Sequence, residues 1–436
     1  MHRRRFLAHM GSLGLGLTAL PELGAHSSKN QRASFGSPDS RSARDWATDE
    51  EFWATVRQAY TSSPTLVNLN NGGVSPHPLV VQEAVERYTR LANEAPSYYM
   101  WRTLEAHREP LRKELALLAG CSPEELAIVR NTTEALDIVI MGLDLKRGDE
   151  VVLTKQDYPN MVHAWKQRER REGIVLKWID LELPIESEKK LVRAFVDQFT
   201  DQTRVVHITH LINYTGQVLP VRWIADEARK RGILVVIDGA HSFAQLDFKI
   251  PDLGGDYFGT SLHKWMCAPF GTGMLYVRKE RIRELWALTP NHLIGPESDD
   301  IRKFEGLGTR SIPHEMAIAH ALDFHNAIGT ARKEARLRFL KDYWTDRARR
   351  IEGVSIRSPR KKDLSSALAL LVIEGWKPTE IAAELETKHK IHVVAIDWEN
   401  IHGVRVTPNV YTSLRDLDRL VAGIEDVASR RPVAEK

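Results

Sequence analysis

An acid and a lysine are the residues of this sequence whose types and spacing point most clearly to chemistry. Asp238 ends an apolar run, 235–237, and Lys264 follows within the segment 256–265. An apolar run that ends in an acid is typical of a buried strand, which carries its carboxylate to the edge where open α/β sheets bind ligands. A lysine beside such a carboxylate can form a Schiff base with a carbonyl group. Each residue alone is common in α/β proteins, so their polar neighbours decide the interpretation.

The neighbours of Lys264 favour a cofactor that carries both an aldehyde and a phosphate. Ser261 and His263 precede the lysine and can donate hydrogen bonds to a phosphate, and the glycine-containing segment 271–273 leads into a new apolar run, 274–277. Pyridoxal 5'-phosphate (PLP) needs a lysine for its aldehyde and an acid that keeps its pyridine nitrogen protonated. We therefore expect Asp238 beneath a PLP ring and Lys264 as its covalent attachment. The two cysteines, Cys121 and Cys267, lack metal-site spacing, so no metal is expected.

This pattern resembles the class V aminotransferase family of fold-type I PLP-dependent enzymes. That family includes cysteine desulfurases, kynureninase and isopenicillin N epimerase. The resemblance covers roughly residues 60–430 in family order and is strongest over 238–264. It implies an enzyme that binds PLP and a small amino-acid substrate.

The resemblance assigns further residues to the cofactor phosphate. Segment 131–136 (NTTEAL) opens an apolar helix, whose first-turn N–H groups and two hydroxyls suit a phosphate. From the local sequence alone an ordinary helix N-cap is the stronger reading, and the resemblance reverses this in favour of Thr132 and Thr133 as phosphate ligands. The segment 306–310 resembles a Gly-Thr segment that reaches the phosphate of a partner subunit, so Thr309 is expected to act across a homodimer interface.

Other residues are assigned to the cofactor ring and its hydroxyl group. Tyr158 occupies the place of the family's aromatic or histidine ring over the cofactor, although an exposed loop tyrosine is an equal alternative. Asn213 and Gln217 resemble the segment that flanks the cofactor hydroxyl, and His241 can reach the same oxygen. The cofactor-binding set is Thr132, Thr133, Tyr158, Asn213, Asp238, His241, Ser261, His263, Lys264 and Thr309.

Arg405 matches the family arginine that forks onto a substrate carboxylate, a task suited to guanidinium geometry. The alternative interpretation of Arg405 is a surface arginine on a strand. The turn at 70–71 and the run 98–102 are candidates for the mouth of the substrate site.

The reaction type is narrowed by a missing cysteine. Desulfurases use a cysteine on a loop shortly before this arginine, and no cysteine follows Cys267. Segments 263–265 and 308–310 are closer to isopenicillin N epimerase, among whose relatives C–S lyases occur. The resemblance implies that the substrate amine displaces Lys264 and that the freed lysine then takes the α-proton. Epimerisation is the main reading; a C–S lyase or an aminotransferase is the alternative, and Lys264 and Asp238 argue against a non-catalytic binding module.

Alternating strands and helices predict the elements that must position these residues. Strands are expected at 151–153, 175–179, 205–209, 234–238 and 274–277, with helices between them. The fold class is therefore α/β, with a large doubly wound domain, a mainly parallel sheet and a smaller α+β domain. The predicted divisions are an N-terminal segment 45–105, a PLP-binding domain 106–315 and a C-terminal domain 316–436. A helical run is expected over 315–350, strands at 367–373 and 392–396, and a final helix opened by Ser413 and Asp416.

Composition and the N-terminus bear on partners and location. The formal charge of +3 has no basic stripe, which disfavours nucleic acid as a partner. Three arginines, Arg3 to Arg5, precede an apolar stretch and predict a twin-arginine signal peptide over 1–25, with a linker over 26–44. The apolar stretch is too short to span a membrane as a stable helix. We therefore expect the twin-arginine export machinery as a partner, a periplasmic or secreted location and no membrane span in the mature chain.

Overall fold

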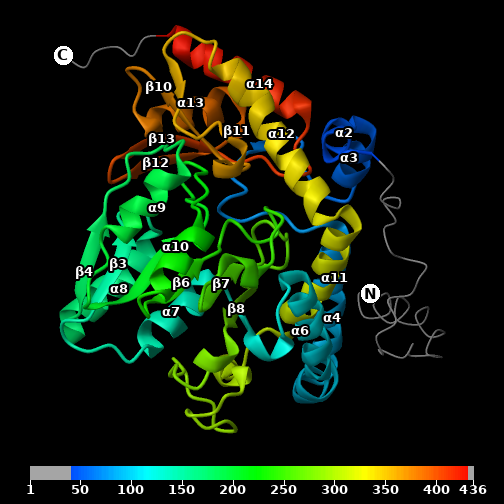
Figure 1. Ribbon diagram of the computed structural model, residues 1–436. Helices are drawn as coiled ribbons and strands as arrows, with labels where there is room; N and C mark the ends of the chain where they lie inside the picture. Colours follow the sequence, from blue (N-terminus) through cyan, green and yellow to red (C-terminus); the bar gives the residue numbers. More distant parts are fainter. Residues whose placement is uncertain (1–40, 431–436) are drawn as a thin grey trace, which may run out of the picture. The chain divides into compact units, whose positions relative to one another are not determined.

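A seven-stranded sheet forms the centre of the computed structural model, which describes residues 41–430 (Figure 1). Strand β8 runs antiparallel to both of its neighbours, and the other neighbouring pairs are parallel. The mainly parallel α/β fold is thus confirmed, with the five predicted strands present and two further strands, β2 and β7. In sheet order the strands are β2 (Leu126–Val129), β8 (Gly273–Val277), β7 (Tyr257–Ser261), β6 (Leu234–Asp238), β5 (Thr203–Thr209), β3 (Glu150–Thr154) and β4 (Val175–Ile179).

Both faces of this sheet are covered, which explains why its strands are apolar on both sides. Along β6, Val235 and Ile237 join one hydrophobic cluster with residues of α9 (Glu188–Val196) and α10 (Val221–Arg229). Val236, between them, joins a second cluster with α7 (Thr132–Gly142) and α8 (Pro159–Glu172). Because side chains alternate across a strand, the two clusters mark the two faces of a doubly wound sheet.

A smaller sheet holds the residues that follow the long helices. Its strands, in order, are β12 (Val394–Trp398), β13 (Ile401–Val406), β10 (Ala369–Ile373) and β9 (Val354–Ile356), all antiparallel. They pack with α12 (Thr330–Ala348), α13 (Pro378–His389) and α14 (Leu414–Ser429) around a third cluster. The predicted capping box of Ser413 and Asp416 is present at α14. Strand β1 (Val67–Asn68) pairs with β11 (Ile391–His392), which brings the segment after α3 (Glu50–Gln58) beside this sheet.

The remaining helices differ from the sequence predictions in two places. Helix α2 (Ala43–Thr48) begins inside the predicted linker, because Ser42 caps it with a capping box. The predicted run 315–350 is two helices, α11 (Ile312–Ile328) and α12, since Gly329 adopts a φ of 85° between them. A π-helical segment (Tyr99–Leu104) lies between α5 (Pro96–Tyr98) and α6 (Arg108–Ala119). Helices α3 (Glu50–Gln58) and α4 (Leu79–Glu94) precede this segment in the chain.

Three sets of predictions are left open by this fold. The predicted signal peptide and residues 26–40 of the predicted linker lie outside the described residues. The domain boundaries at 105 and 315 stay predictions. Within 41–430, no helix is long and apolar enough to cross a membrane.

Candidate active site

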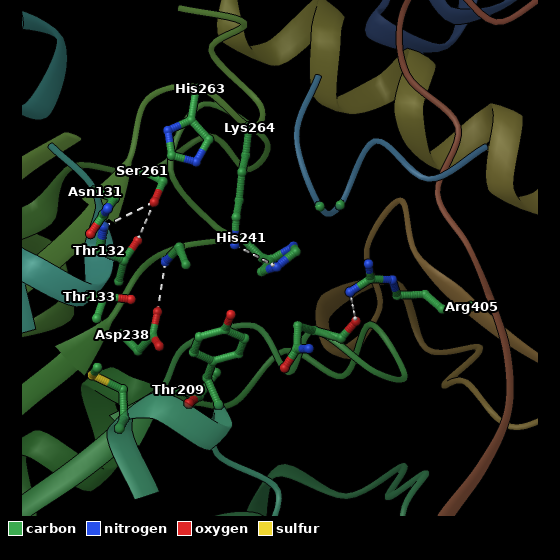
Figure 2. A pocket seen from close by; sticks show the side chains of 16 residues that line it. Asn131, Thr132, Thr133, Thr209, Asp238, His241, Ser261, His263, Lys264 and Arg405 are labelled. Carbon is green, nitrogen blue, oxygen red and sulfur yellow. Dashed lines mark hydrogen bonds between the residues drawn. The ribbon is translucent and has the colours of Figure 1, made fainter. Parts of the chain in front are cut away.

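A cavity of about 310 Å³ lies at the carboxyl ends of the central strands. Strands β5, β6 and β7 deliver Thr209, Asp238 and Ser261 to it, because the ends of parallel strands meet at one edge of a sheet. The smaller sheet contributes Arg405 from β13 on the opposite side (Figure 2). The lining residues are Gly72, Gly73, Asn131, Thr132, Thr133, Tyr158, Met161, Thr209, Asn213, Asp238, Ala240, His241, Ser261, His263, Lys264 and Arg405.

Asp238 is fixed at the floor of the cavity. Only 3% of it is exposed, and the backbone N–H of Ala240 donates to its Oδ1 at 2.9 Å. Burial raises the pKa of Asp238, while the Ala240 N–H opposes that rise. The next residue, Gly239, has no room for a side chain, because a Cβ there would lie 1.9 Å from Cζ of Phe258. The buried carboxyl group therefore needs a cationic partner to stay ionised.

Lys264 lies beside His241 in the middle of the cavity. Its Nζ is 3.2 Å from Nε2 of His241 and 5.9 Å from the centre of the Tyr158 ring. Burial lowers the pKa of Lys264 to about 8, and the nearby Arg405 adds to this effect while Asp238 opposes it. An amine with this pKa is available as a nucleophile or base near neutral pH.

Hydroxyl groups and a helix N-terminus gather at one end of the cavity. The backbone N–H of Thr132 donates to Oγ of Ser261 at 2.9 Å, and the two hydroxyl oxygens are 2.7 Å apart. Asn131 caps α7 by accepting from Glu134 N–H, so the helix N-terminus faces this end. Gly273 permits the close approach, because a Cβ there would lie 2.7 Å from Asn131 Cα. Together with Thr133 these groups form a site suited to a phosphate.

His263 borders the same end, but its neutral form cannot donate toward a phosphate. Its Nδ1 is 3.1 Å from the carbonyl oxygen of Thr272, which can only accept, so Nδ1 carries the proton. Burial and the charge of Lys264 lower the pKa of His263 to about 4. The predicted donor role therefore requires that the negative charge of a bound phosphate raise the pKa of His263, so that Nε2 takes up a proton from solvent.

Arg405 dominates the other end of the cavity. Its Nη1 donates to the Asn213 carbonyl oxygen at 3.2 Å, and its Nη2 donates to Oδ1 of Asn70 at 2.9 Å. It is 7% exposed, and burial lowers its pKa to about 10. Its Nε and the Oδ1 of Asn213 are buried without a hydrogen-bond partner in the described part of the chain. Unpartnered buried polar atoms that line a cavity indicate groups that await a ligand.

These groups fit PLP from end to end. The helix N-terminus with its hydroxyls suits the phosphate, Asp238 suits a protonated pyridine nitrogen, and Lys264 suits the aldehyde carbon. The Oδ1 of Asn213 and the imidazole of His241 can form hydrogen bonds with polar substituents of the cofactor ring. Fold and site together thus define a fold-type I PLP-dependent enzyme.

The comparisons with known proteins lead to the family. The model of the family "Aminotransferase class-V" matches residues 67–413. Isopenicillin N epimerase of Streptomyces clavuligerus is 30% identical over 393 residues, which cover 86% of this chain and 98% of that protein. The chain therefore belongs to the class V aminotransferase family and uses PLP as its cofactor.

Two further relatives show how broad this family is. A probable cysteine desulfurase of Halalkalibacterium halodurans is 27% identical, over 86% of this chain and 96% of that protein. A solved structure of a C-DES mutant, with glycine covalently linked to its PLP cofactor, aligns with a TM-score of 0.77. Its identity is 22%, over 85% of this chain and 99% of that one, so it shows the fold alone.

Most of the site residues predicted from the sequence line one cavity, and four sets of residues do not. Thr309 is exposed and outside the cavity of its own chain. Gln217 is buried, and its side chain bonds the backbone of Ile185 instead of reaching the cavity, so its predicted place near the cofactor hydroxyl is wrong. The run 98–102 and the turn at 70–71 also lie outside the cavity lining, although Asn70 accepts a hydrogen bond from Arg405.

Several lining residues were not identified from the sequence. Thr209 ends β5 directly opposite Asp238 in the strand register, and its hydroxyl donates to Asp157 at 2.6 Å. Its place at the end of a predicted strand was a usable signal. Gly72 lies against Arg405 and His241, where an added Cβ would be 3.2 Å from Cζ of Arg405. No local pattern reveals such a contact.

Proposed function

We propose that this enzyme removes the α-proton of an amino-acid substrate and returns a proton with inversion at Cα. One observation carries the proposal: the Lys264 amine lies in the same cavity as Asp238 and Arg405. A base, a carboxylate for the cofactor ring and a cation for the substrate carboxylate are the groups that Cα chemistry requires. The epimerase relative supports the same outcome.

Each residue has a separate task in this proposal. When bound, PLP supplies an electrophilic carbon for the substrate amine and a ring that withdraws electron density from Cα. Arg405 offers its unpartnered Nε, and the remaining N–H groups of its fork, to the substrate carboxylate. Lys264 Nζ takes the α-proton from one face of Cα, and Asp238 keeps a proton on the pyridine nitrogen through charge pairing. Inversion requires that a second acid or a water molecule return a proton to the opposite face. Tyr158, at the start of α8, lines the cavity and would lie against the cofactor ring.

The absence of cysteine from the cavity separates this proposal from desulfuration. The chain has two cysteines; Cys267 is 1% exposed and Cys121 is partly buried, and neither lines the cavity. A cysteine nucleophile that could accept sulfur from the substrate is therefore missing.

Incubation with candidate amino acids in deuterated water tests the proposal. Epimerisation predicts α-deuterated product of inverted configuration without net loss of substrate. A keto acid would indicate transamination instead, and pyruvate with released sulfur would indicate a C–S lyase. Complete retention of the α-proton in every amino acid tested would contradict Cα chemistry altogether.

We also propose that the enzyme is a homodimer in which Thr309 completes the phosphate site of the partner subunit. The exposed position of Thr309 outside its own cavity is compatible with such a role. Sedimentation should give a dimer, and Thr309→Val should weaken PLP binding although the residue does not touch its own cavity. A monomer with unchanged PLP affinity in this variant would contradict the proposal.

We further propose export through the twin-arginine route, which rests on the arginines at 3–5 and the following apolar stretch. The enzyme is then expected in the periplasm or outside the cell. Replacing all three arginines with lysine should leave the protein in the cytoplasmic fraction, while the unchanged chain fractionates outside it. Equal distribution of both chains would refute the proposal.

A further inference from the structure

Trp265, the residue after Lys264, determines which nitrogen of His241 carries a proton. The indole Nε1–H donates to Nδ1 of His241 at 3.4 Å, while Nε2 of the same ring lies 3.2 Å from Lys264 Nζ. An indole nitrogen can only donate, so Nδ1 must be an acceptor. A neutral imidazole whose Nδ1 accepts carries its single proton on Nε2, which faces the lysine.

The ring is neutral because of its surroundings. His241 is 5% exposed, and burial, followed by the charges of Lys264 and Arg405, lowers its pKa well below the ordinary value. Within residues 41–430, no carboxylate is hydrogen-bonded to the imidazole. Asp238 is the acid that acts on Lys264 from the floor of the cavity. An ammonium group has no acceptor to offer an N–H donor, so the His241 contact forms only with a neutral lysine amine.

We propose that Trp265 is a positioning residue that fixes His241 in the Nε2–H tautomer, and that this tautomer holds the Lys264 nitrogen as a hydrogen-bond acceptor. The lysine is thereby kept in the basic form that can take a proton. The inference rests on the proposed role of Lys264 as the base but not on the outcome at Cα.

The backbone that carries the indole is also held in place. Trp265 is fully buried, and the ammonium group of the buried Lys333 donates to its backbone carbonyl oxygen. Lys333 Nζ also lies 3.4 Å from Nδ1 of His325. A side chain that is fixed at its backbone and closely packed can impose a tautomer on its neighbour, because its N–H cannot turn elsewhere.

A pH titration of the visible absorption of the PLP-loaded, full-length protein tests the proposal. The absorption changes when the lysine nitrogen gains a proton. In Trp265→Phe the imidazole is free to offer Nε2 as an acceptor, so the midpoint should rise by about one pH unit. The matched control is Trp53→Phe, which removes another buried indole N–H. That N–H donates to the Trp46 carbonyl oxygen at 2.7 Å, and its loss should leave the midpoint unchanged.

A second background separates the tautomer from a general loss of packing. Glutamine has no tautomers, so Trp265→Phe should produce no shift in a His241→Gln protein. A midpoint that stays constant in Trp265→Phe, or that shifts equally in both backgrounds or in Trp53→Phe, overturns the proposal.

Nitrogen NMR of the unsubstituted protein reads the tautomer of His241 directly. The signals of His241, assigned by their loss in His241→Gln, should show a protonated Nε2 and a bare Nδ1. A protonated Nδ1 overturns the proposal. Neither measurement uses substrate turnover, so both stand or fall separately from the proposed epimerisation.

Discussion

Replacement of Arg405 by glutamine should weaken the use of substrates that carry an α-carboxylate, and of those alone. Of the five N–H groups of the guanidinium, one donates to Asn213 O and one to Asn70 Oδ1. Three N–H groups remain, including the buried Nε, and two of them suffice for a bidentate carboxylate. Each charge-assisted hydrogen bond contributes roughly 1.5–3 kcal/mol. We expect a loss of about 3 kcal/mol, which corresponds to roughly 150-fold in kcat/KM.

The assay compares an amino-acid substrate with the amine that lacks its carboxylate. Deuterium exchange at the carbon next to nitrogen should fall in Arg405→Gln for the amino acid and stay nearly constant for the amine. Arg419→Gln, at an exposed position of α14, is the matched control and should change neither rate. Equal losses for both substrates, or a loss below about 5-fold for the amino acid, would refute the assignment.

The stability of this variant distinguishes a binding defect from a folding defect. Arg405 is a buried cation that forms no ion pair with a carboxylate in the described part of the chain, so its removal relieves a desolvation cost. The two lost hydrogen bonds offset that relief. We expect the free energy of unfolding in urea to change by less than about 1 kcal/mol.

Three further predictions concern other parts of the cavity. In PLP-free protein, the rate at which Lys264 reacts with an amine-modifying reagent should reach half of its maximum at or below about pH 8, because burial disfavours the ammonium form. A midpoint near pH 10.5 would contradict this. Tyr158→Phe should keep PLP affinity, whereas Tyr158→Ala should lower it by about 3- to 10-fold if the ring stacks on the cofactor, and equal effects in a PLP titration would argue against stacking. Gly239→Ala should lower the free energy of unfolding by about 1–3 kcal/mol, because its Cβ would overlap Phe258, while Gly295→Ala in open space should not.

The central acid and lysine could be predicted because they follow a general rule of open sheets. Asp238 closes an apolar run, and the carboxyl ends of parallel strands share one edge, so the sequence alone places its carboxylate at a ligand site. The same rule applied to every strand end would also have found Thr209, which pairs with Asp238 in the register.

Other features depend on contacts that no local pattern contains. Strand β7 contains Gly259 and is buried on both faces, so it shows neither the alternation nor the composition that identifies strands. Gly72 meets Arg405 only because β1 and the smaller sheet come together, far apart in sequence. Gln217 resembled a cofactor ligand in its motif, but its amide satisfies the backbone of Ile185. The direction of that side chain is set by packing.

The tautomers of His241 and His263 were also beyond the sequence. Each depends on whether a ring nitrogen meets a donor, as with the Trp265 indole, or an acceptor, as with the Thr272 carbonyl. The sequence supplied the residue types, and the three-dimensional structure supplied the partners that decide their protonation.

Borohydride reduction of the PLP-loaded protein, followed by mass spectrometry of its peptides, tests the central claim most directly. The claim is that Lys264 attaches the cofactor in the cavity above Asp238. Reduction should fix one phosphopyridoxyl group on the peptide that contains Lys264, and Lys264→Ala should abolish the label, while Lys279→Ala, on the surface, should retain it. A label on another lysine, or none on a protein saturated with PLP, would contradict the account.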